Sequence, residues 1–392
     1  MEAFFNKILA FFMTIIMFLF PTLNIPETEA TVDDWNTEYT FVFVHGLGGW
    51  GEYDFANKVM PYWGVATGDM MKYLRARGFD VAAASVTPAG SAWDRACELY
   101  AQLTGTRVDY GKAHSEKYGH SQYGTDYTGK ALIDEFDAEN KINLLGHSFG
   151  GATILMFLDL MADGSEAEQE VTPIEEISPL FTGGKADWIY SMVTLSAPMN
   201  GTSAYEVRDA VMADPNATLA EKAECEMISI ATTMLPNDGR SKDDSAEYDM
   251  KIDHAQAMLA NFETQENVYY FSVPTDATMI DEETGKVVPN YDLVEPLFQP
   301  CMHRVCDINF VTEGGVVVDE SWWPNDGLVN TISAKAPFNA PSKDYDENDI
   351  QSGIWNVMPT FIGDHTVFMG DLTKMTCVRE FYVDILNMIN EL

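Results

Sequence analysis

Basic residues are scarce in this chain of 392 residues. Only 23 Lys and Arg stand against 61 Asp and Glu, and the formal net charge is −38. A field of this sign repels the phosphates of nucleic acids and the headgroups of anionic lipids. The composition therefore excludes nucleic-acid binding, while acidic faces remain able to collect divalent cations.

Cysteine and internal repetition are also lacking. Five cysteines are too few for a disulfide framework in a chain this long. Cys301 and Cys306 could close a small loop, and buried free thiols are an equal alternative. The sequence shows no repeated period, which excludes a solenoid or a propeller.

The chain has one apolar run near its start, at residues 8–20, which is short for a membrane span of roughly 20 residues. Lys7 precedes this run, and the small residues Thr28 and Ala30 fit a signal-peptidase site. We expect residues 1–30 to be a signal peptide and residues 31–392 to be the mature, secreted domain. A retained N-terminal anchor is the alternative.

Strand and helix patterns alternate along the rest of the chain. Buried strands are predicted at 40–44, 81–86, 141–145, 191–195 and 267–273, and helices at 69–77, 92–103, 131–139 and 152–161. This alternation predicts an α/β protein whose mostly parallel sheet carries helices on both faces. Residues 106–128 form a polar loop in this interpretation. Residues 202–262 are too long for a plain connection, so we expect a functional insertion there.

Two short polar runs are assigned no site. The acidic run at 344–349 lacks the Gly and the final Glu of a calcium loop, so it predicts a solvated turn. The run from Cys301 through His303 to Cys306 has metal-ligand residue types but no second half with matching spacing.

The strongest motif is GHSFG at residues 146–150, a G-x-S-x-G pentapeptide with an apolar strand before it and an apolar helix after it. This context is typical of a nucleophile elbow, a tight turn that exposes a serine above the sheet of an α/β-hydrolase. Ser148 is therefore the predicted nucleophile.

Two backbone N–H groups must hold the oxyanion of such an enzyme. One is expected at Phe149, directly after the nucleophile. The other is expected at Leu47, in the HGLGGWG loop that follows the first strand. His45 and His147 are interpreted as structural neighbours of these donors.

The general base and its acid must follow the nucleophile in the chain. His365 lies after the apolar run 355–361, where a last strand would end, whereas His254 and His303 lie in the insertion and the cysteine loop. The acid is open between two residues. Asp276 directly follows a strand, and Asp326 lies in a WPNDG turn; Asp364 is too close to His365 in sequence to face its ring.

Several further segments carry a resemblance to a known family. These are KYLRARGFDV, SAWDRACELYAQLTGTRVDYGKAH with KYGH after it, SPLFTGGK, APMNGT, WPNDGLVNT and GIWNVMPTFIGDH. Together with HGLGGWG they resemble the secreted, zinc-containing lipases of bacilli and staphylococci, from about residue 40 to the C-terminus. The resemblance implies an α/β-hydrolase fold.

The resemblance also implies site residues. The family's triad acid falls on Asp326 and its base on His365, so the expected triad is Ser148, Asp326 and His365. One structural zinc ion is implied, with its ligands at Asp94, His114, His120 and Asp244, and Asp243 as a neighbour that could replace Asp244.

Two departures from the family pattern alter the expectations. The family's calcium carboxylates fall here on Val367 and Leu372, with Asp371 one residue off, so calcium is not expected. The lid segment is shorter than in the family and is expected at residues 210–235.

We therefore expect a secreted triacylglycerol lipase that acts at a lipid–water interface and has no stable protein partner. An esterase or phospholipase A acting on shorter or soluble esters is the alternative among enzymes. A non-catalytic surface module that kept the fold is the alternative outside enzymes.

Overall fold

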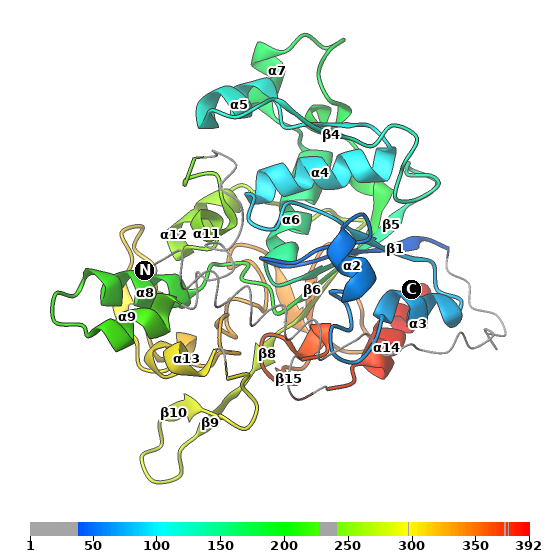
Figure 1. Ribbon diagram of the computed structural model, residues 1–392. Coiled ribbons are helices and arrows are strands. Elements are labelled where there is room, and N and C mark those ends of the chain that lie inside the picture. Colours follow the sequence, from blue (N-terminus) through cyan, green and yellow to red (C-terminus); the bar gives the residue numbers. More distant parts are fainter. Residues whose placement is uncertain (1–37, 227–240, 297, 372–373, 375) are drawn as a thin grey trace.

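A seven-stranded sheet forms the centre of the computed structural model, which describes residues 38–226, 241–296, 298–371, 374 and 376–392 (Figure 1). The strand order is β13-β14-β7-β6-β5-β1-β2, and every pairing in it is parallel. In chain order the strands are β1 (Thr40–Val44), β2 (Val81–Ala84), β5 (Ile142–His147), β6 (Ile189–Leu195), β7 (Tyr269–Val273), β13 (Ser342–Asp344) and β14 (Trp355–Val357).

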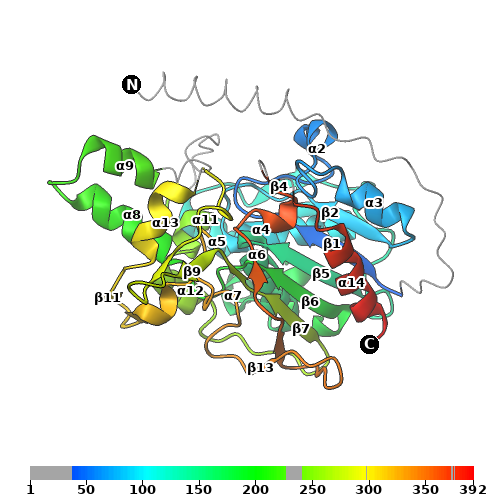
Figure 2. The same cartoon turned by 90° about the horizontal axis from the view of Figure 1, so that it is seen from below.

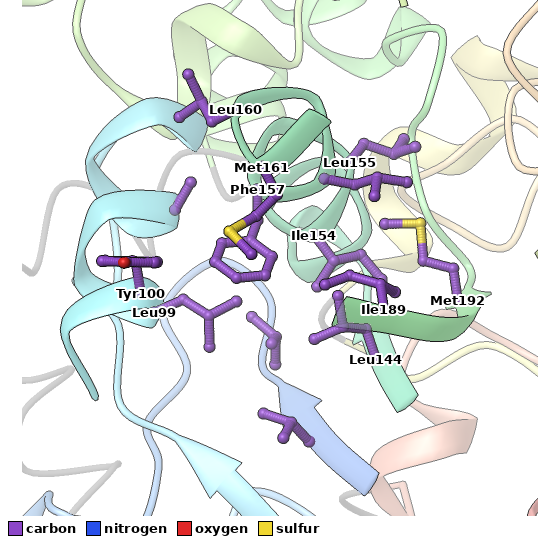
Figure 3. Close-up of a cluster of buried hydrophobic side chains, with 14 of the residues drawn as sticks. Leu99, Tyr100, Leu144, Ile154, Leu155, Phe157, Leu160, Met161, Ile189 and Met192 are labelled. Atoms are coloured by element: carbon purple, nitrogen blue, oxygen red, sulfur yellow. The ribbon is translucent and has the colours of Figure 1, made fainter. Parts of the chain in front are cut away.

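The central strands are apolar on both faces, as a sheet covered by helices on both sides requires. On one face Leu144 and Met192 pack against α4 (Ala92–Thr104) and α6 (Phe149–Ala162) (Figure 3). The largest side chain in this layer that comes from α6 is Phe157, which is fully buried.

The opposite face is covered by α3 (Met70–Ala76) and α14 (Arg379–Asn390). Phe43 and Leu145 of the sheet meet Leu74 and Leu386 of these helices in a second buried cluster. The predicted α/β class, with helices on both faces of a parallel sheet, is confirmed as an α/β-hydrolase-like fold.

The described part of the predicted insertion is mostly helical. It contains α8 (Ser203–Ala213), α9 (Leu219–Glu226), α11 (Ala246–Asp249) and α12 (Ile252–Met258). Helices α8 and α9 pack on each other and on α13 (Gln299–Val305), and the pair projects away from the sheet (Figure 2). The expected lid segment, 210–235, contributes the end of α8 and all of α9. Residues 214–218 connect the two helices, and residues 227–235 lie outside the described residues.

The expected signal peptide, residues 1–30, also lies outside the described residues. Across the part of the chain that the structure describes, no helix combines the length and the apolar character that a membrane crossing needs.

Two expectations for the region after α4 are wrong. No helix forms at 131–139, because the Asp137 carboxylate accepts hydrogen bonds from the backbone N–H groups of Glu139 and Asn140 and holds a turn there. Residues 106–128 are not a plain loop, since they form β3 (Arg107–Asp109), α5 (Lys112–Tyr118) and β4 (Tyr123–Asp126) above α4 (Figure 1).

The two short polar runs are described except for the Cys301 side chain. The acidic run ends β13 and continues as an exposed turn closed by a hydrogen bond from Asp349 N to Asp346 O. Cys306 is a buried free thiol, so it closes no loop with Cys301.

The remaining elements are short and peripheral. They are α2 (Phe55–Val59), α7 (Glu166–Val171), β8 (Thr275–Asp276), β9 (Thr278–Ile280), β10 (Val287–Pro289), β11 (Phe310–Val311), β12 (Val317–Val318) and β15 (Phe361–Ile362), together with short 3₁₀ turns.

Phe157 provides a test of the core between α4, α6 and the sheet. Replacing it with Ala should lower the free energy of unfolding by about 3–5 kcal/mol, because the change leaves a cavity in a close-packed layer. The matched control is Phe55→Ala on α2, where the ring is 77% exposed and the change should stay within about 0.5 kcal/mol. Chemical denaturation of both variants measures the difference, and equal losses would contradict this packing.

Candidate active site

Ser148 occupies a sharp turn between β5 and α6, with φ of 55° and ψ of −130°. This backbone conformation is unfavourable for a residue with a side chain, and close packing on both sides maintains it. A Cβ on Gly146 would lie 2.5 Å from Gly150 O, and a Cβ on Gly150 would lie 2.1 Å from Val44 O. The two glycines of the motif are thus required by the approach of the helix to the strands.

His365 follows β15, which pairs in parallel with β8 and so brings this loop over the ends of the central strands. Its Nε2 lies 2.7 Å from Ser148 Oγ. The backbone N–H of His365 donates to Asp326 O at 2.9 Å, which anchors the loop to the turn that carries the acid. The ring is therefore held in hydrogen-bond contact with the serine.

Asp326 faces the other nitrogen of the same ring, with Oδ2 2.9 Å from His365 Nδ1. Thr275 Oγ1 donates to the same oxygen at 2.6 Å, and the Val329 N–H donates to Oδ1 at 2.8 Å. Burial alone would raise the pKa of Asp326, but His365 and these donors lower the pKa below its ordinary value. The acid therefore stays ionised beside the imidazole.

The structure separates the two acids that residue-level reasoning left open. Asp276 Oδ1 accepts hydrogen bonds from Thr278 N and Oγ1 and closes a local turn. Among the other downstream histidines, His254 stacks on Tyr248 and His303 is exposed. The three side chains that the structure brings together are Ser148, His365 and Asp326.

The loop that carries Leu47 is fixed by buried donors. His45 Nδ1 lies 2.8 Å from Gly46 O and Arg95 Nη1 lies 3.4 Å from it, while Arg95 Nη2 donates to His45 O. The Arg95 guanidinium also lies 5.0 Å from the centre of the Phe149 ring.

These contacts fix the direction of the second expected oxyanion donor. In a trans peptide the N–H points opposite to the preceding carbonyl, and the Gly46–Leu47 bond is trans. Holding Gly46 O toward Arg95 therefore turns the Leu47 N–H the other way. Sequence reasoning assigned no role to Arg95 or Thr275. Arg95 lies in the SAWDRAC segment quoted for the family resemblance, directly after Asp94, whereas no motif marks Thr275.

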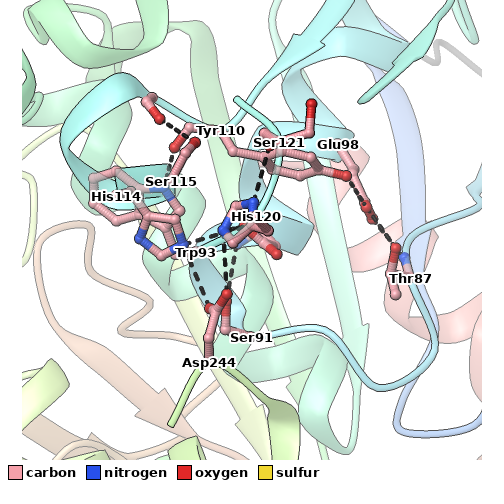
Figure 4. Close-up of polar contacts among 12 residues, drawn as sticks. Thr87, Ser91, Trp93, Glu98, Tyr110, His114, Ser115, His120, Ser121 and Asp244 are labelled. Atoms are coloured by element: carbon pink, nitrogen blue, oxygen red, sulfur yellow. Dashed lines mark hydrogen bonds and ion pairs between the residues drawn. The ribbon is translucent and has the colours of Figure 1, made fainter. Parts of the chain in front are cut away.

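The four predicted metal ligands converge at the first turn of α4. Figure 4 shows three of them, His114, His120 and Asp244. His114 Nε2 lies 3.2 Å from Asp94 Oδ1 and 3.4 Å from Asp244 Oδ1. His120 Nε2 lies 3.3 Å from Asp244 Oδ2. Asp243, the possible substitute, is exposed, whereas Asp244 is buried.

The donor atoms of this cluster fit a metal ion. His120 Nδ1 lies 2.9 Å from the carbonyl of Ser121, so the ring donates there and leaves Nε2 unprotonated. The Nε2 atoms of both histidines and both carboxylate oxygens of Asp244 are buried without a hydrogen-bond partner among the described residues. Two imidazoles and two carboxylates can complete a tetrahedral zinc site with no position left for catalysis.

A second buried cluster brings Glu295, Asp364 and Asp371 together, with one oxygen of each within 4.8 Å of the others. Calcium was not expected from the sequence because positions 367 and 372 carry no carboxylate and Asp371 is one residue off the family pattern. The structure adds Glu295 and Asp364 to Asp371, and three carboxylates are donors of the kind that calcium takes. Burial raises the pKa of Asp364 to about 7, so this carboxyl resists ionisation when no cation is bound.

Comparisons with known proteins place these features in a family. The family model described as "Lipase-like, C-terminal domain" matches residues 37–213 and 237–391. Lipase 2 of Staphylococcus aureus is 33% identical over 385 residues, and the lipase of Staphylococcus hyicus is 32% identical over 377 residues. These matches cover 89% and 88% of this chain, but 54% and 56% of the relatives. The chain thus spans about half the length of the curated relatives that it matches.

Solved structures agree with these matches. EstA from Clostridium botulinum superposes with a TM-score of 0.79 at 30% identity, covering 96% of this chain and 93% of that one. The Staphylococcus hyicus lipase superposes with a TM-score of 0.74 at 29% identity, covering 92% of this chain and 98% of that one. The similarity therefore includes the central sheet and the insertions around it.

Proposed function

The chain belongs to the family of bacillus- and staphylococcus-type lipases, as its motifs suggested, and on this premise we propose that it is a secreted hydrolase of acylglycerol esters. The observation that supports the proposal most is the continuous contact from Ser148 through His365 to Asp326. An apolar ester substrate is also consistent with the strongly negative charge, which disfavours anionic ligands.

The proposed reaction follows from the roles that these contacts permit. Ser148 Oγ attacks the ester carbonyl while His365 Nε2 takes its proton, and Asp326 fixes the Nδ1–H tautomer of the ring. The N–H groups of Phe149 and Leu47 hold the oxyanion of the tetrahedral intermediate. His365 then gives the proton to the leaving alcohol, and water attacks the acyl-enzyme with His365 as the base.

The metal cluster has a structural role in this proposal. Asp94, His114, His120 and Asp244 would hold one zinc ion, which neutralises the two carboxylates and ties α4 and α5 to the insertion. The ion takes no part in ester cleavage, because four protein ligands fill its coordination.

The surroundings of the site are proposed to meet a lipid–water interface. Leu219 at the start of α9 is 88% exposed and Met212 on α8 is 42% exposed, so the α8–α9 pair carries apolar side chains to the surface. We retain residues 1–30 as a signal peptide and residues 31–392 as one domain. The proposal includes no stable protein partner.

One observation favours a second candidate, an esterase or phospholipase A that acts on shorter or soluble esters. The described part of the lid segment, in α8 and α9, projects away from the sheet and does not lie across it (Figure 2). A soluble ester needs no interfacial opening of a cover, so such a site would serve it directly.

Removing the nucleophile is the first test. Ser148→Ala should lower kcat on a triacylglycerol emulsion by about 10⁶-fold and abolish labelling by a fluorophosphonate, because no other residue would form the acyl-enzyme. Asp326→Asn should lower kcat by about 10⁴-fold, since the imidazole would lose its orienting acceptor. Asp276→Asn is the matched control and should keep activity. Failure of the wild-type protein to react with the probe would favour the non-catalytic surface module.

Substrate class is tested with a series of nitrophenyl esters of increasing acyl length and with emulsified triacylglycerol. A lipase should hydrolyse long-chain emulsions with a higher kcat/KM than short soluble esters, because its apolar surface adsorbs to the interface. Highest activity on dissolved butyrate, without an increase on emulsions, would select the second candidate.

Zinc is tested on protein purified without chelator. One zinc ion per chain should be found by elemental analysis, and His120→Ala should lose it with a fall in Tm on the order of 5–10 °C. His303→Ala, at an exposed histidine outside the cluster, is the control and should retain both the metal and the Tm. Metal-free wild-type protein with an unchanged Tm in strong chelator would refute the zinc assignment.

A further inference from the structure

A chain of buried hydrogen bonds connects the oxyanion loop to the base by a route outside the triad. The Gly46 N–H donates to Tyr62 Oη at 3.0 Å. Tyr62 Oη lies 2.6 Å from His147 Nδ1, and His147 Nε2 lies 2.8 Å from the backbone carbonyl of His365. Two parts of the site that come from opposite ends of the sequence are thus in contact through two side chains.

The direction of every bond in this chain is fixed by its ends. The Gly46 N–H can only donate, so Tyr62 Oη accepts there and has its own proton left for His147 Nδ1. The carbonyl of His365 can only accept, so His147 Nε2 must carry the ring proton. Both ends therefore select the same neutral tautomer of His147.

The surroundings keep this tautomer neutral. Tyr62 is 4% exposed and His147 is 1% exposed. Burial, followed by the nearby His365, lowers the pKa of His147 to about 3, and burial raises the pKa of the Tyr62 hydroxyl. The His147 ring lies 5.1 Å from the His365 ring, so a neutral His147 adds no positive charge beside the imidazolium that forms during acylation.

We propose that Tyr62 and His147 are positioning residues that hold the oxyanion loop and His365 in a fixed position relative to each other. The proposal rests on the proposed ester hydrolysis and adds two residues that act through the backbone of others. Gly46 is held by its carbonyl through His45 and Arg95 and by its N–H through Tyr62. Without Tyr62 the N–H side of this loop is released, and the direction of the Leu47 N–H depends on the contacts of Gly46 O alone.

The alternative is that Tyr62 and His147 are only satisfied polar groups of the core. In that case removing the Tyr62 hydroxyl lowers stability and leaves turnover unchanged. A positioning role predicts a loss in kcat with little change in KM, because the oxyanion contact is made in the transition state. The two roles therefore separate in steady-state kinetics.

The experiment compares Tyr62→Phe with Tyr270→Phe in the full chain. Tyr270 is a matched control because it is fully buried on β7, away from Ser148. Its hydroxyl accepts a hydrogen bond from the backbone N–H of Gln265 at 2.8 Å. Both variants should lose similar stability. Only Tyr62→Phe should lower kcat on a nitrophenyl ester, by about 10- to 100-fold with KM within about twofold, as expected for a small misplacement of catalytic groups.

Unchanged kcat in Tyr62→Phe, or an equal loss in Tyr270→Phe, overturns the proposal. Should Tyr62→Phe not fold, His147→Gln and His147→Met are compared instead. Gln keeps one donor and one acceptor, so it should retain at least tenfold more kcat than Met, and equal activity overturns the proposal. A wild-type protein that cleaves no ester refutes the proposed function itself, and this inference with it.

Discussion

The backbone of Ser148 is the constraint on which the rest of the site depends. An L-residue at φ of 55° is stable only when its neighbours leave the chain no other path. Here the Ser148 N–H donates to Leu195 O at 2.8 Å, and Gly150 lies against the carbonyl of Val44. The strands on either side of β5 thus fix the turn, and the parallel sheet is part of the geometry of the candidate site.

The first turn of α4 joins the metal cluster to this geometry. Asp94 belongs to the cluster, and the next residue, Arg95, reaches the carbonyls of the oxyanion loop and the ring of Phe149. The N–H of Ala92, two residues before Asp94, donates to the Asp249 carboxylate of the insertion at 2.7 Å. A single helical turn therefore contacts the insertion, the candidate metal ligands and the loop that carries Leu47.

Local signals were predictable from sequence, while long-range pairings were not. Ser148 is recognisable from its motif between a strand and a helix. His365 is recognisable because the base follows the nucleophile and the acid in the chain order of this fold. The choice between Asp276 and Asp326 needed the family resemblance, because a position after a strand and a position in a turn both suit the acid. Only the folded chain shows that Asp276 is engaged by Thr278. The helix expected at 131–139 does not form for a local reason, because the Asp137 carboxylate accepts backbone hydrogen bonds that hold a turn there. The contact of Glu295 with Asp364 could not be predicted, because no sequence motif or residue spacing links the two positions.

Charge balance distinguishes the two buried clusters. The cluster of Asp94, His114, His120 and Asp244 holds two carboxylates and two imidazoles, so a bound dication would leave it neutral. Its ring Nε2 atoms have no hydrogen-bond partner among the described residues and could ligate such an ion. The cluster behind His365 has three carboxylates and no imidazole, and three buried negative charges cannot persist together. Burial raises the pKa of Asp364 to about 7, so this carboxyl is only partly ionised at neutral pH when no cation is bound. Partial protonation of Asp364 limits the negative charge in this cluster, and Asp326 remains the carboxylate that contacts the His365 ring.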